Sequence, residues 1–350
     1  MSTVKVGVIG YGGMGGYHVK HMAKSGIIEA KGIYDIDPKS QKRAAENGLV
    51  VYKNYEDLLA DPELEAVLIA TPNDWHPFYA KACAKAGKGV ICEKPAAISP
   101  SLFEDMAETA EECGTLLMVH QNRRWDDDYL VVKNIYEKNL LGPIGRIESR
   151  VQGANGVPSG WRCEKIKGGG MMLDWGVHMI DQIMFMMKEK LLHLYCQYSF
   201  EAGYDCDDAF KLEMVFSGNK CVEVVVDTNC FTPLPRWVVY GHDGTAVVED
   251  WDLNGKMVRP IYTEKPREIT GIKAGNGFTK TMAYRPHDTV ETLPLEIVKP
   301  EPFAFYKHFI KALHKEEEPY VKNWEVLRVL KIMTAAAKSA AENKVVEIDF

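Results

Sequence analysis

The stretch VKVGVIGYGGMG, residues 4–15, decides the fold of the first part of the chain. An apolar run of strand length leads into GYGGMG at 10–15, which has the form G-x-G-x-x-G, and a helical pattern follows directly. In this form the first glycine permits a tight turn, the second lets the backbone approach a pyrophosphate, and the third lets helix and strand pack closely. The stretch therefore predicts a strand, a turn and a helix whose N-terminus faces a dinucleotide.

An acidic residue stands where this fingerprint expects one. Asp35 ends the next apolar run, EAKGIYD, about 20 residues beyond the last glycine. Its carboxylate can accept a hydrogen bond from a ribose 2′-hydroxyl and would repel a 2′-phosphate. The sequence therefore favours NAD over NADP as the cofactor.

Short apolar runs alternate with helical patterns through the first 122 residues. The runs are VKVGVIG, EAKGIYD, AVLIA, KGVICEK and TLLMVH, and helical stretches such as WHPFYAKACAKAG and LFEDMAETAEECG separate them. Strand and helix repeated in this way indicate a parallel sheet with helices on both faces. We therefore predict a doubly wound Rossmann domain over residues 1–122 in an α/β protein.

The pattern changes in residues 123–350. A helix is expected around residues 127–139, then the turn LGPIG, a second helix, and the strand-like runs HLYCQYSF, AFKLEMVF, CVEVVVDTN, RWVVYG and TAVVED. Two helical stretches and a last strand, VVEIDF, close the chain. This half is predicted to be an α/β domain with an antiparallel or mixed sheet.

Composition excludes several classes of protein. The chain has 350 residues, 46% hydrophobic and 26% charged, and a net charge of −7 without a block of Lys or Arg, which argues against nucleic acid or an anionic membrane as partner. Its 8 cysteines show no zinc-like spacing, so we expect reduced thiols and no metal site. No segment approaches the ~20 apolar residues of a membrane span, and the N-terminal run is too short for a signal peptide. We expect a cytoplasmic protein with a small-molecule ligand.

The helix-length stretch GGGMMLDWGVHMIDQIMFMM, residues 168–187, is apolar except at four positions. At about 100° per residue, Asp174, His178, Asp181 and Gln182 fall on one polar stripe. Asp174 and His178 are four apart, so the carboxylate can orient or charge the ring as an acid–base pair. The alternative is a core helix with a satisfied Asp–His hydrogen bond.

Two further motifs follow strands of the first half. TPN at 71–73 comes after AVLIA, and EKP at 93–95 comes after KGVIC, so both lie at carboxyl ends of parallel strands, where open α/β sheets bind ligands. Pro95 disfavours a helical backbone at Lys94 and can hold a cis bond, which would fix the direction of the ammonium. The alternative for Lys94 is a solvated surface residue.

With these motifs the chain resembles, nearly end to end, the Gfo/Idh/MocA family of sugar and polyol dehydrogenases. The matching stretches are GYGGMG, ATPNDWH, AGKGVICEKP, GPIGRI, WR ahead of GGG, and GGGMMLDWGVHMID. The resemblance implies a Rossmann domain followed by an α/β domain with a large open sheet that commonly makes homo-oligomers. It also implies that Lys94, Asp174 and His178 are the catalytic set, with the polar stripe facing the nicotinamide.

Residues from all these motifs make up the predicted site. The predicted cofactor-binding residues are Gly10, Gly12, Gly13, Met14, Gly15, Asp35, Thr71, Asn73, His76, Glu93 and Lys94. The predicted substrate-binding residues are Lys94, Arg124, Trp161, Arg162, Asp174 and His178. Planar donors and aromatic faces suit sugar rings, although surface arginines and a packed tryptophan are the alternative. His76 matches a recurring histidine of the family, or is simply a residue at a helix N-terminus.

The predicted reaction oxidises a secondary alcohol with NAD. A base must take the hydroxyl proton as hydride leaves the same carbon. His178 is the expected base, Asp174 would fix the ring or hold a neighbouring substrate hydroxyl, and Lys94 would stabilise the alkoxide-like charge. The residues 155–167 and 263–285 are expected to shape the pocket.

The resemblance suggests free sugars, inositols, and glycosides oxidised at a ring hydroxyl such as C3 as substrates, and it favours a glycoside 3-dehydrogenase. Two other functions stay open. One is an NAD-dependent glycosidase with an internal redox cycle. The other is a nucleotide-binding sensor or scaffold that keeps the fold without the chemistry.

Overall fold

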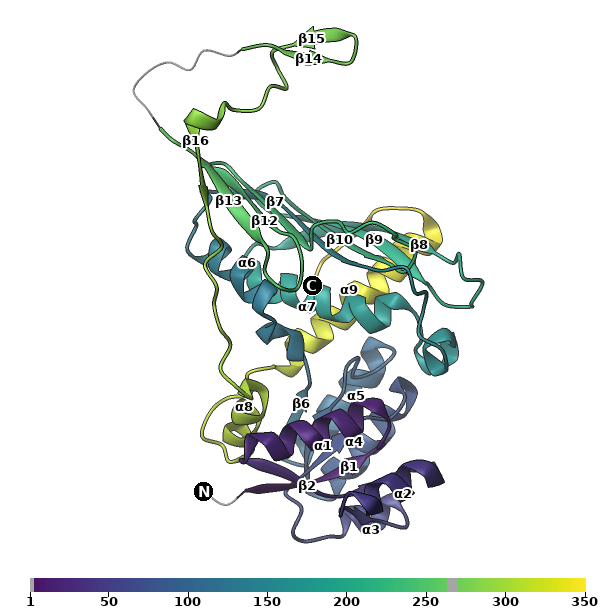
Figure 1. The fold of residues 1–350 in the computed structure, drawn as a ribbon. Coiled ribbons are helices and arrows are strands. Elements are labelled where there is room, and N and C mark those ends of the chain that lie inside the picture. The colour runs from purple at the N-terminus through teal and green to yellow at the C-terminus, as the bar shows by residue number, and fades with distance from the viewer. Residues whose placement is uncertain (1–2, 263–269) are drawn as a thin grey trace.

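The computed structural model describes residues 3–262 and 270–350 (Figure 1). The first part of the chain forms a six-stranded parallel sheet in the order β3-β2-β1-β4-β5-β6, the doubly wound arrangement of a Rossmann domain. The bounds are β1 Val4–Ile9, β2 Ile28–Tyr34, β3 Val50–Val51, β4 Ala66–Ile69, β5 Gly89–Cys92 and β6 Leu117–Val119. The five predicted strands are confirmed, whereas β3 is too short to leave a hydrophobic run in the sequence.

Helices connect these strands and cover the sheet. They are α1 Gly13–Ser25, α2 Pro38–Glu46, α3 Tyr55–Leu59, α4 His76–Lys85 and α5 Pro100–Glu112. The side chains of Asp37, Asn54 and Ser99 accept hydrogen bonds from backbone N–H groups in the first turns of α2, α3 and α5. Each such cap stabilises its helix by about 1 kcal/mol and fixes where the preceding loop ends. The loops that carry the predicted site are therefore held at defined points.

The second sheet has nine strands in the order β16-β13-β12-β11-β7-β10-β9-β8-β17. It is mixed, because β10 pairs in parallel with β7 and antiparallel with β9. The bounds are β7 Ile144–Gln152, β8 Leu191–Ser199, β9 Ala209–Phe216, β10 Lys220–Asp227, β11 Trp237–Gly241, β12 Gly244–Val248, β13 Gly255–Pro260, β16 Val290–Leu293 and β17 Val346–Glu347. The predicted α/β fold with a large mixed sheet is confirmed.

The central strand β7 corrects the sequence analysis, which put only a turn and a helix in this region. Its outward positions carry Arg146, Glu148 and Arg150, and both arginines pair with the glutamate between them. Since those positions are charged, the strand leaves no apolar run to detect. Its inward residues Ile144 and Ile147 are buried in the core.

Helices cover one face of the second sheet and separate it from the Rossmann domain (Figure 1). They are α6 Asp127–Glu137, α7 Val177–Met186 and α9 Asn323–Glu342, and a π-helical turn over Met172–Gly176 leads into α7. No described helix covers the opposite face (Figure 1), where polar pairs such as Lys211 with Glu223, 2.9 Å apart, occupy the strands. The sheet is therefore open on one side.

The helix α8, Ala304–Leu313, returns to the Rossmann domain although it follows the second sheet in sequence (Figure 1). The hydroxyl of Tyr306 lies 2.7 Å from Nδ1 of His18 in α1, and His314 pairs with Glu65 at 3.1 Å. The helix α8, from the range 123–350, thus packs on the range 1–122.

The hairpin of β14 Ile272–Ala274 and β15 Gly277–Thr279 projects beyond β16, at the end of the molecule far from the Rossmann domain (Figure 1). Of the stretch 263–285 that was expected to shape the pocket, residues 263–269 lie outside the described residues. The described residues 270–285 do not approach the Rossmann domain, so the expectation that they shape the pocket is wrong.

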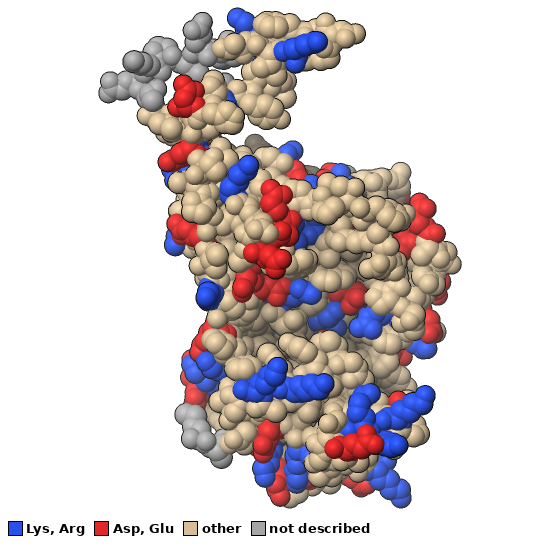
Figure 2. Space-filling view, in the orientation of Figure 1, with Lys and Arg blue, Asp and Glu red and all other residues tan. Residues whose placement is uncertain are grey.

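Charged residues of both signs are spread over the face in Figure 2, without the continuous basic field typical of a nucleic-acid-binding surface. None of the described helices combines the length and the apolar character needed to cross a membrane.

Candidate active site

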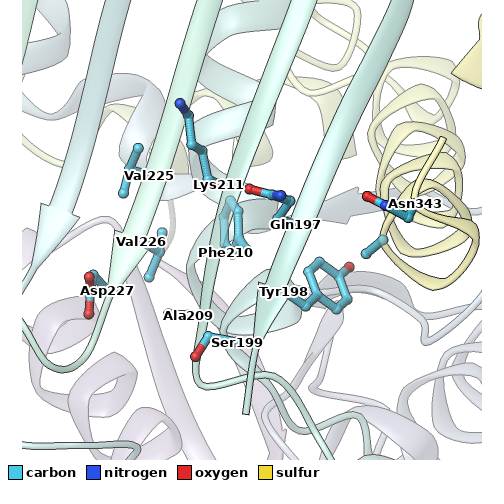
Figure 3. Close-up of a pocket in the computed structure, with 11 residues that line it drawn as sticks. Gln197, Tyr198, Ser199, Ala209, Phe210, Lys211, Val225, Val226, Asp227 and Asn343 are labelled. Atoms are coloured by element: carbon cyan, nitrogen blue, oxygen red, sulfur yellow. The ribbon is translucent and has the colours of Figure 1, made fainter. Parts of the chain in front are cut away.

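Most of the predicted residues line a cavity of about 800 Å³ at the carboxyl ends of β1, β2, β4 and β5, whereas Gly15, Arg124 and His178 do not line it. This volume is typical of cofactor and ligand sites. The glycine turn and Asp35 line one end, and Lys94, Trp161, Arg162 and Asp174 line the other. A second hollow of about 450 Å³ is lined by residues of β8, β9 and β10 together with Ala340 and Asn343 at the end of α9 (Figure 3), and contains none of the predicted residues.

The glycine turn has the geometry that a pyrophosphate needs. Gly10 adopts a left-handed backbone with φ of 91°, and a Cβ on Gly15 would overlap the Gly10 carbonyl oxygen, so the third glycine lets α1 pack against the turn. Cβ atoms on Gly12 and Gly13 would meet open space within 4 Å. Because α1 begins at Gly13, accessible backbone and a helix N-terminus coincide, which fits a dinucleotide.

The carboxylate of Asp35 is fixed at the end of β2 by two backbone groups. Oδ2 accepts the N–H of Tyr11 at 2.6 Å, and Oδ1 accepts the N–H of Asp37 at 2.8 Å. Each carboxylate oxygen keeps a lone pair for a ribose hydroxyl. Asp37, the N-cap of α2, adds a second negative charge to this stretch, and the Arg43 guanidinium on Tyr11 adds a positive one.

Side chains of the loop after β4 form hydrogen bonds that fix neighbouring parts of the cavity wall. Nδ2 of the buried Asn73 donates to the carbonyl oxygen of Gly168 at 2.9 Å and so links this loop to the segment before α7. His76 has Nδ1 2.9 Å from the Pro95 oxygen and Nε2 3.0 Å from the Thr71 oxygen. Burial lowers the pKa of His76, so the neutral ring donates to one carbonyl at a time and ties the loops after β4 and β5 together.

Lys94 meets Asp174 across 80 residues of sequence. Its Nζ donates to Oδ1 of Asp174 at 2.9 Å and to the Asp174 carbonyl oxygen at 3.0 Å. Arg162 approaches the other carboxylate oxygen, with Nε 3.6 Å from Oδ2. Burial opposes ionisation of Asp174, but the Lys94 ammonium and then Arg162 outweigh it, so the net effect lowers the pKa of this carboxyl. The pair is charged and lies in the cavity wall.

His178 lies in the first turn of α7, is 5% exposed, and is not among the residues that line the cavity. Its Nδ1 is buried without a hydrogen-bond partner among the described residues. Burial first, and then the positive charges of Lys94 and Arg123, hold the pKa of His178 well below its ordinary value. The ring is therefore neutral at pH 7.

The predicted pairing of Asp174 with His178 does not form. Asp174 lies in the π-helical turn Met172–Gly176, where the regular spacing of an α-helix is lost, and its carboxylate is taken by Lys94 and Arg162. A hydrogen bond from a charged donor is stronger than one from a neutral imidazole, which explains why the Asp174 carboxylate pairs with Lys94 and not with His178.

Arg124 corrects the predicted substrate set. It is 2% exposed, and it donates from Nε and Nη2 to the two carboxylate oxygens of Asp181 at 2.8 and 2.7 Å. Its Nη1 donates to Glu325 of α9 at 2.9 Å. Arg124 thus fastens α7 to α9 and does not line the cavity. Asp181, on the predicted stripe, has the same structural role, and Gln182 donates to the Arg123 carbonyl oxygen at 2.7 Å.

Trp161 and Arg162 do line the cavity, as predicted, on the 3₁₀ turn Trp161–Cys163. The guanidinium of Arg162 lies 4.5 Å from the centre of the Trp161 ring. The stretch 155–167 therefore contributes to the pocket.

An unpredicted aromatic wall lies at the nucleotide end and consists of Tyr34, Tyr55, Trp75, Phe78 and Tyr79. Its one signal in the sequence is the aromatic run NDWHPFY directly after TP.

Glu93 is held by two histidines that the sequence analysis did not single out. Its Oε1 accepts from Nε2 of His18 at 2.7 Å and from Nδ1 of His120 at 2.8 Å. Its Oε2 lies 3.2 Å from the backbone N of Lys94. These three side chains offer ligand atoms within 4.8 Å of one another, as a metal site would, but hydrogen bonds account for the spacing without an ion.

Comparisons with known proteins match both parts of the chain. Residues 4–121 match the model of an oxidoreductase family with an NAD-binding Rossmann fold, and residues 129–247 match that of the GFO/IDH/MocA C-terminal domain. A crystal structure of an NAD-binding protein from Listeria innocua is 40% identical, with a TM-score of 0.96, and the match covers 99% of this chain and 100% of that one.

Two relatives known from their sequences match over nearly their whole length. The uncharacterized oxidoreductase YdgJ of Escherichia coli strain K12 is 32% identical over 97% of this chain and 96% of its own. The scyllo-inositol 2-dehydrogenase (NADP(+)) IolW of Bacillus subtilis is 26% identical over 100% of this chain and 97% of its own.

Proposed function

The chain belongs to the GFO/IDH/MocA oxidoreductase family, and from this premise we propose that it transfers a hydride between a secondary alcohol of a sugar, glycoside or inositol and NAD. The observation that carries the proposal is the contact of Lys94 with Asp174 at one end of a cavity whose other end is a dinucleotide turn. An amine and a carboxylate there can bind the hydroxyl groups of a polyol.

Each member of the catalytic set has a role that its surroundings support. NAD, when bound, supplies the hydride acceptor. The Lys94 ammonium donates to the reacting oxygen and stabilises the negative charge that develops on it. Asp174 keeps Lys94 in place and accepts a hydrogen bond from a neighbouring hydroxyl. His178 is neutral at pH 7 and is the proposed base for the hydroxyl proton.

The cavity supports a cyclic polyol as the substrate class. Trp161 presents an aromatic face and Arg162 a planar donor beside Asp174. The relative IolW is named as a scyllo-inositol 2-dehydrogenase, which supports inositols as substrates. Oxidation of a glycoside at C3 is the narrower expectation from the sequence. We propose these as one class of substrates that share adjacent ring hydroxyls.

The experiment that tests this function is a panel of sugars, glycosides and inositols incubated with NAD and followed by NADH absorbance. Substrate-dependent formation of NADH supports the dehydrogenase. Release of free sugar without net NADH would favour the glycosidase with an internal redox cycle. Nucleotide binding without turnover of any member of the panel, in either direction, would favour the sensor.

We propose NAD rather than NADP, although the relative IolW is named as NADP-dependent. Asp35 supports this choice, because its fixed carboxylate would lie against the extra phosphate of NADP.

Replacing Asp35 with serine should narrow the preference for NAD, measured as the ratio of kcat/KM with NAD to kcat/KM with NADP, by roughly tenfold. Removing a charge close to the phosphate site accounts for an effect of this order. Asp105→Ser on α5 is a matched control, since that carboxylate is about half exposed and pairs only with Lys81 among the described residues. An unchanged ratio in Asp35→Ser would remove Asp35 from the site.

A further inference from the structure

Glu93 places a buried carboxylate in the wall of the cavity. The residue is 4% exposed, lines the cavity, and directly precedes Lys94 in the loop after β5. Burying an isolated carboxylate costs several kcal/mol, so a group of this kind persists only with strong partners. The mechanism above does not use Glu93.

Two elements distant in sequence supply those partners, and a third supports one of them. His18 comes from α1, His120 follows β6, and Tyr306 comes from α8. The Tyr306 hydroxyl lies 2.7 Å from Nδ1 of His18, so it can donate to that nitrogen while Nε2 of His18 donates to Glu93. His120 donates to the same Oε1 of Glu93 from its Nδ1. One proton on each ring satisfies every contact.

The charge of this network follows from its hydrogen bonds. Glu93 accepts a hydrogen bond from each of the two imidazole rings, the arrangement expected of an ionised carboxylate, which can only accept. Burial opposes ionisation of Glu93, but the histidines outweigh it and hold its pKa well below the ordinary value. Burial also lowers the pKa of His18. The Lys94 ammonium does not cancel the charge, because it lies against the Asp174 carboxylate at 2.9 Å.

We propose that Glu93, held by His18 and His120, sets the ratio of the affinities of this protein for oxidised and reduced dinucleotide. The oxidised nicotinamide ring is a cation and the reduced ring is neutral, so a fixed anion in the cavity wall stabilises the oxidised form more. The proposal rests on the proposed function in one respect, that the end of the cavity beside Lys94 receives the nicotinamide.

The test is a pair of binding titrations without substrate, with NAD and with NADH, on the wild-type chain and on Glu93→Gln. We expect the ratio of the dissociation constant for NAD to that for NADH to rise about tenfold in the variant, the order of a charge interaction across several Å of protein. For a two-electron couple this corresponds to a shift of about 30 mV in the potential of the bound nucleotide.

Two controls separate charge from structure. Glu93→Asp keeps the charge and should keep the ratio, even if both nucleotides bind more weakly. Glu104→Gln removes a carboxylate that is 42% exposed on α5, and should change neither constant. If Glu93→Gln does not fold, the double variant Glu93→Gln with His120→Asn gives the new amide N–H an acceptor and is titrated instead.

The outcomes are distinct. If Glu93→Gln leaves the ratio of the two dissociation constants unchanged, the inference is overturned. A purely structural role would weaken the binding of NAD and NADH by the same factor. Failure of the wild-type chain to bind either nucleotide would instead overturn the proposed function. A raised ratio with Glu93→Gln alone, and not with Glu93→Asp, supports the electrostatic role.

Discussion

Replacing Lys94 with methionine is expected to lower kcat by a factor on the order of 100 to 1,000, while binding of NAD changes far less. Methionine keeps the length of the side chain and removes the ammonium, which donates to Asp174 at 2.9 Å and lies in the cavity wall. Losing one donor to a developing oxyanion has an effect of this size. The measurement is kcat with a confirmed substrate, together with the dissociation constant of NAD.

Lys88→Met is the matched control for this prediction. Nζ of Lys88 donates to the carbonyl oxygens of Asp61 and Leu64, both at 2.8 Å, and the residue lies just before β5 rather than at its carboxyl end. It should lower stability slightly and leave kcat unchanged. If Lys94→Met turns over substrate as the wild type does, the ammonium does not act on the reacting oxygen.

The Rossmann domain was predictable because each of its signals is local. Gly10 and Gly15 mark a turn that other residues cannot make, and buried parallel strands read as continuous apolar runs. The strand β7 lacks such a run, since its outward positions are charged and satisfied by one another. Only its pairing with β10 and β11 defines β7 as a strand, and the sequence of β7 alone does not predict that pairing.

The site was predictable to the extent that it follows strand ends and family motifs. Lys94 and Asp174, to which the resemblance assigns catalytic roles, lie in contact. The role of Arg124 was not predictable, because its partners Asp181 and Glu325 are 57 and 201 residues away and neither carries a distinguishing pattern. The hydrogen bonds of His18 in α1 and His120 after β6 to Glu93 were not predictable either. In the sequence these two histidines look like ordinary helix or loop residues. Helical spacing also fails at Asp174, because a π-helical turn cannot be read from apolar periodicity.

Replacing His178 with alanine is expected to remove most turnover, with a fall in kcat on the order of 100 to 10,000-fold, the usual contribution of a general base. NAD should still bind, because His178 lies in α7 and not at the glycine turn. The pH profile of kcat/KM gives a second readout. Burial and the charges of Lys94 and Arg123 lower the pKa of His178. The ring therefore stays neutral as the pH falls past 6.5, and the acidic limb of the profile should lie below that value.

His193→Ala on β8 is the control for this variant, because it removes an imidazole from the second sheet, away from the cavity. It should leave both kcat and the pH profile unchanged. Near-normal kcat in His178→Ala, measured with a confirmed substrate, would show that another group takes the proton. An acidic limb well above pH 6.5 in the wild type would contradict a neutral buried base, since a raised pKa requires a nearby anion that outweighs burial and the two cations.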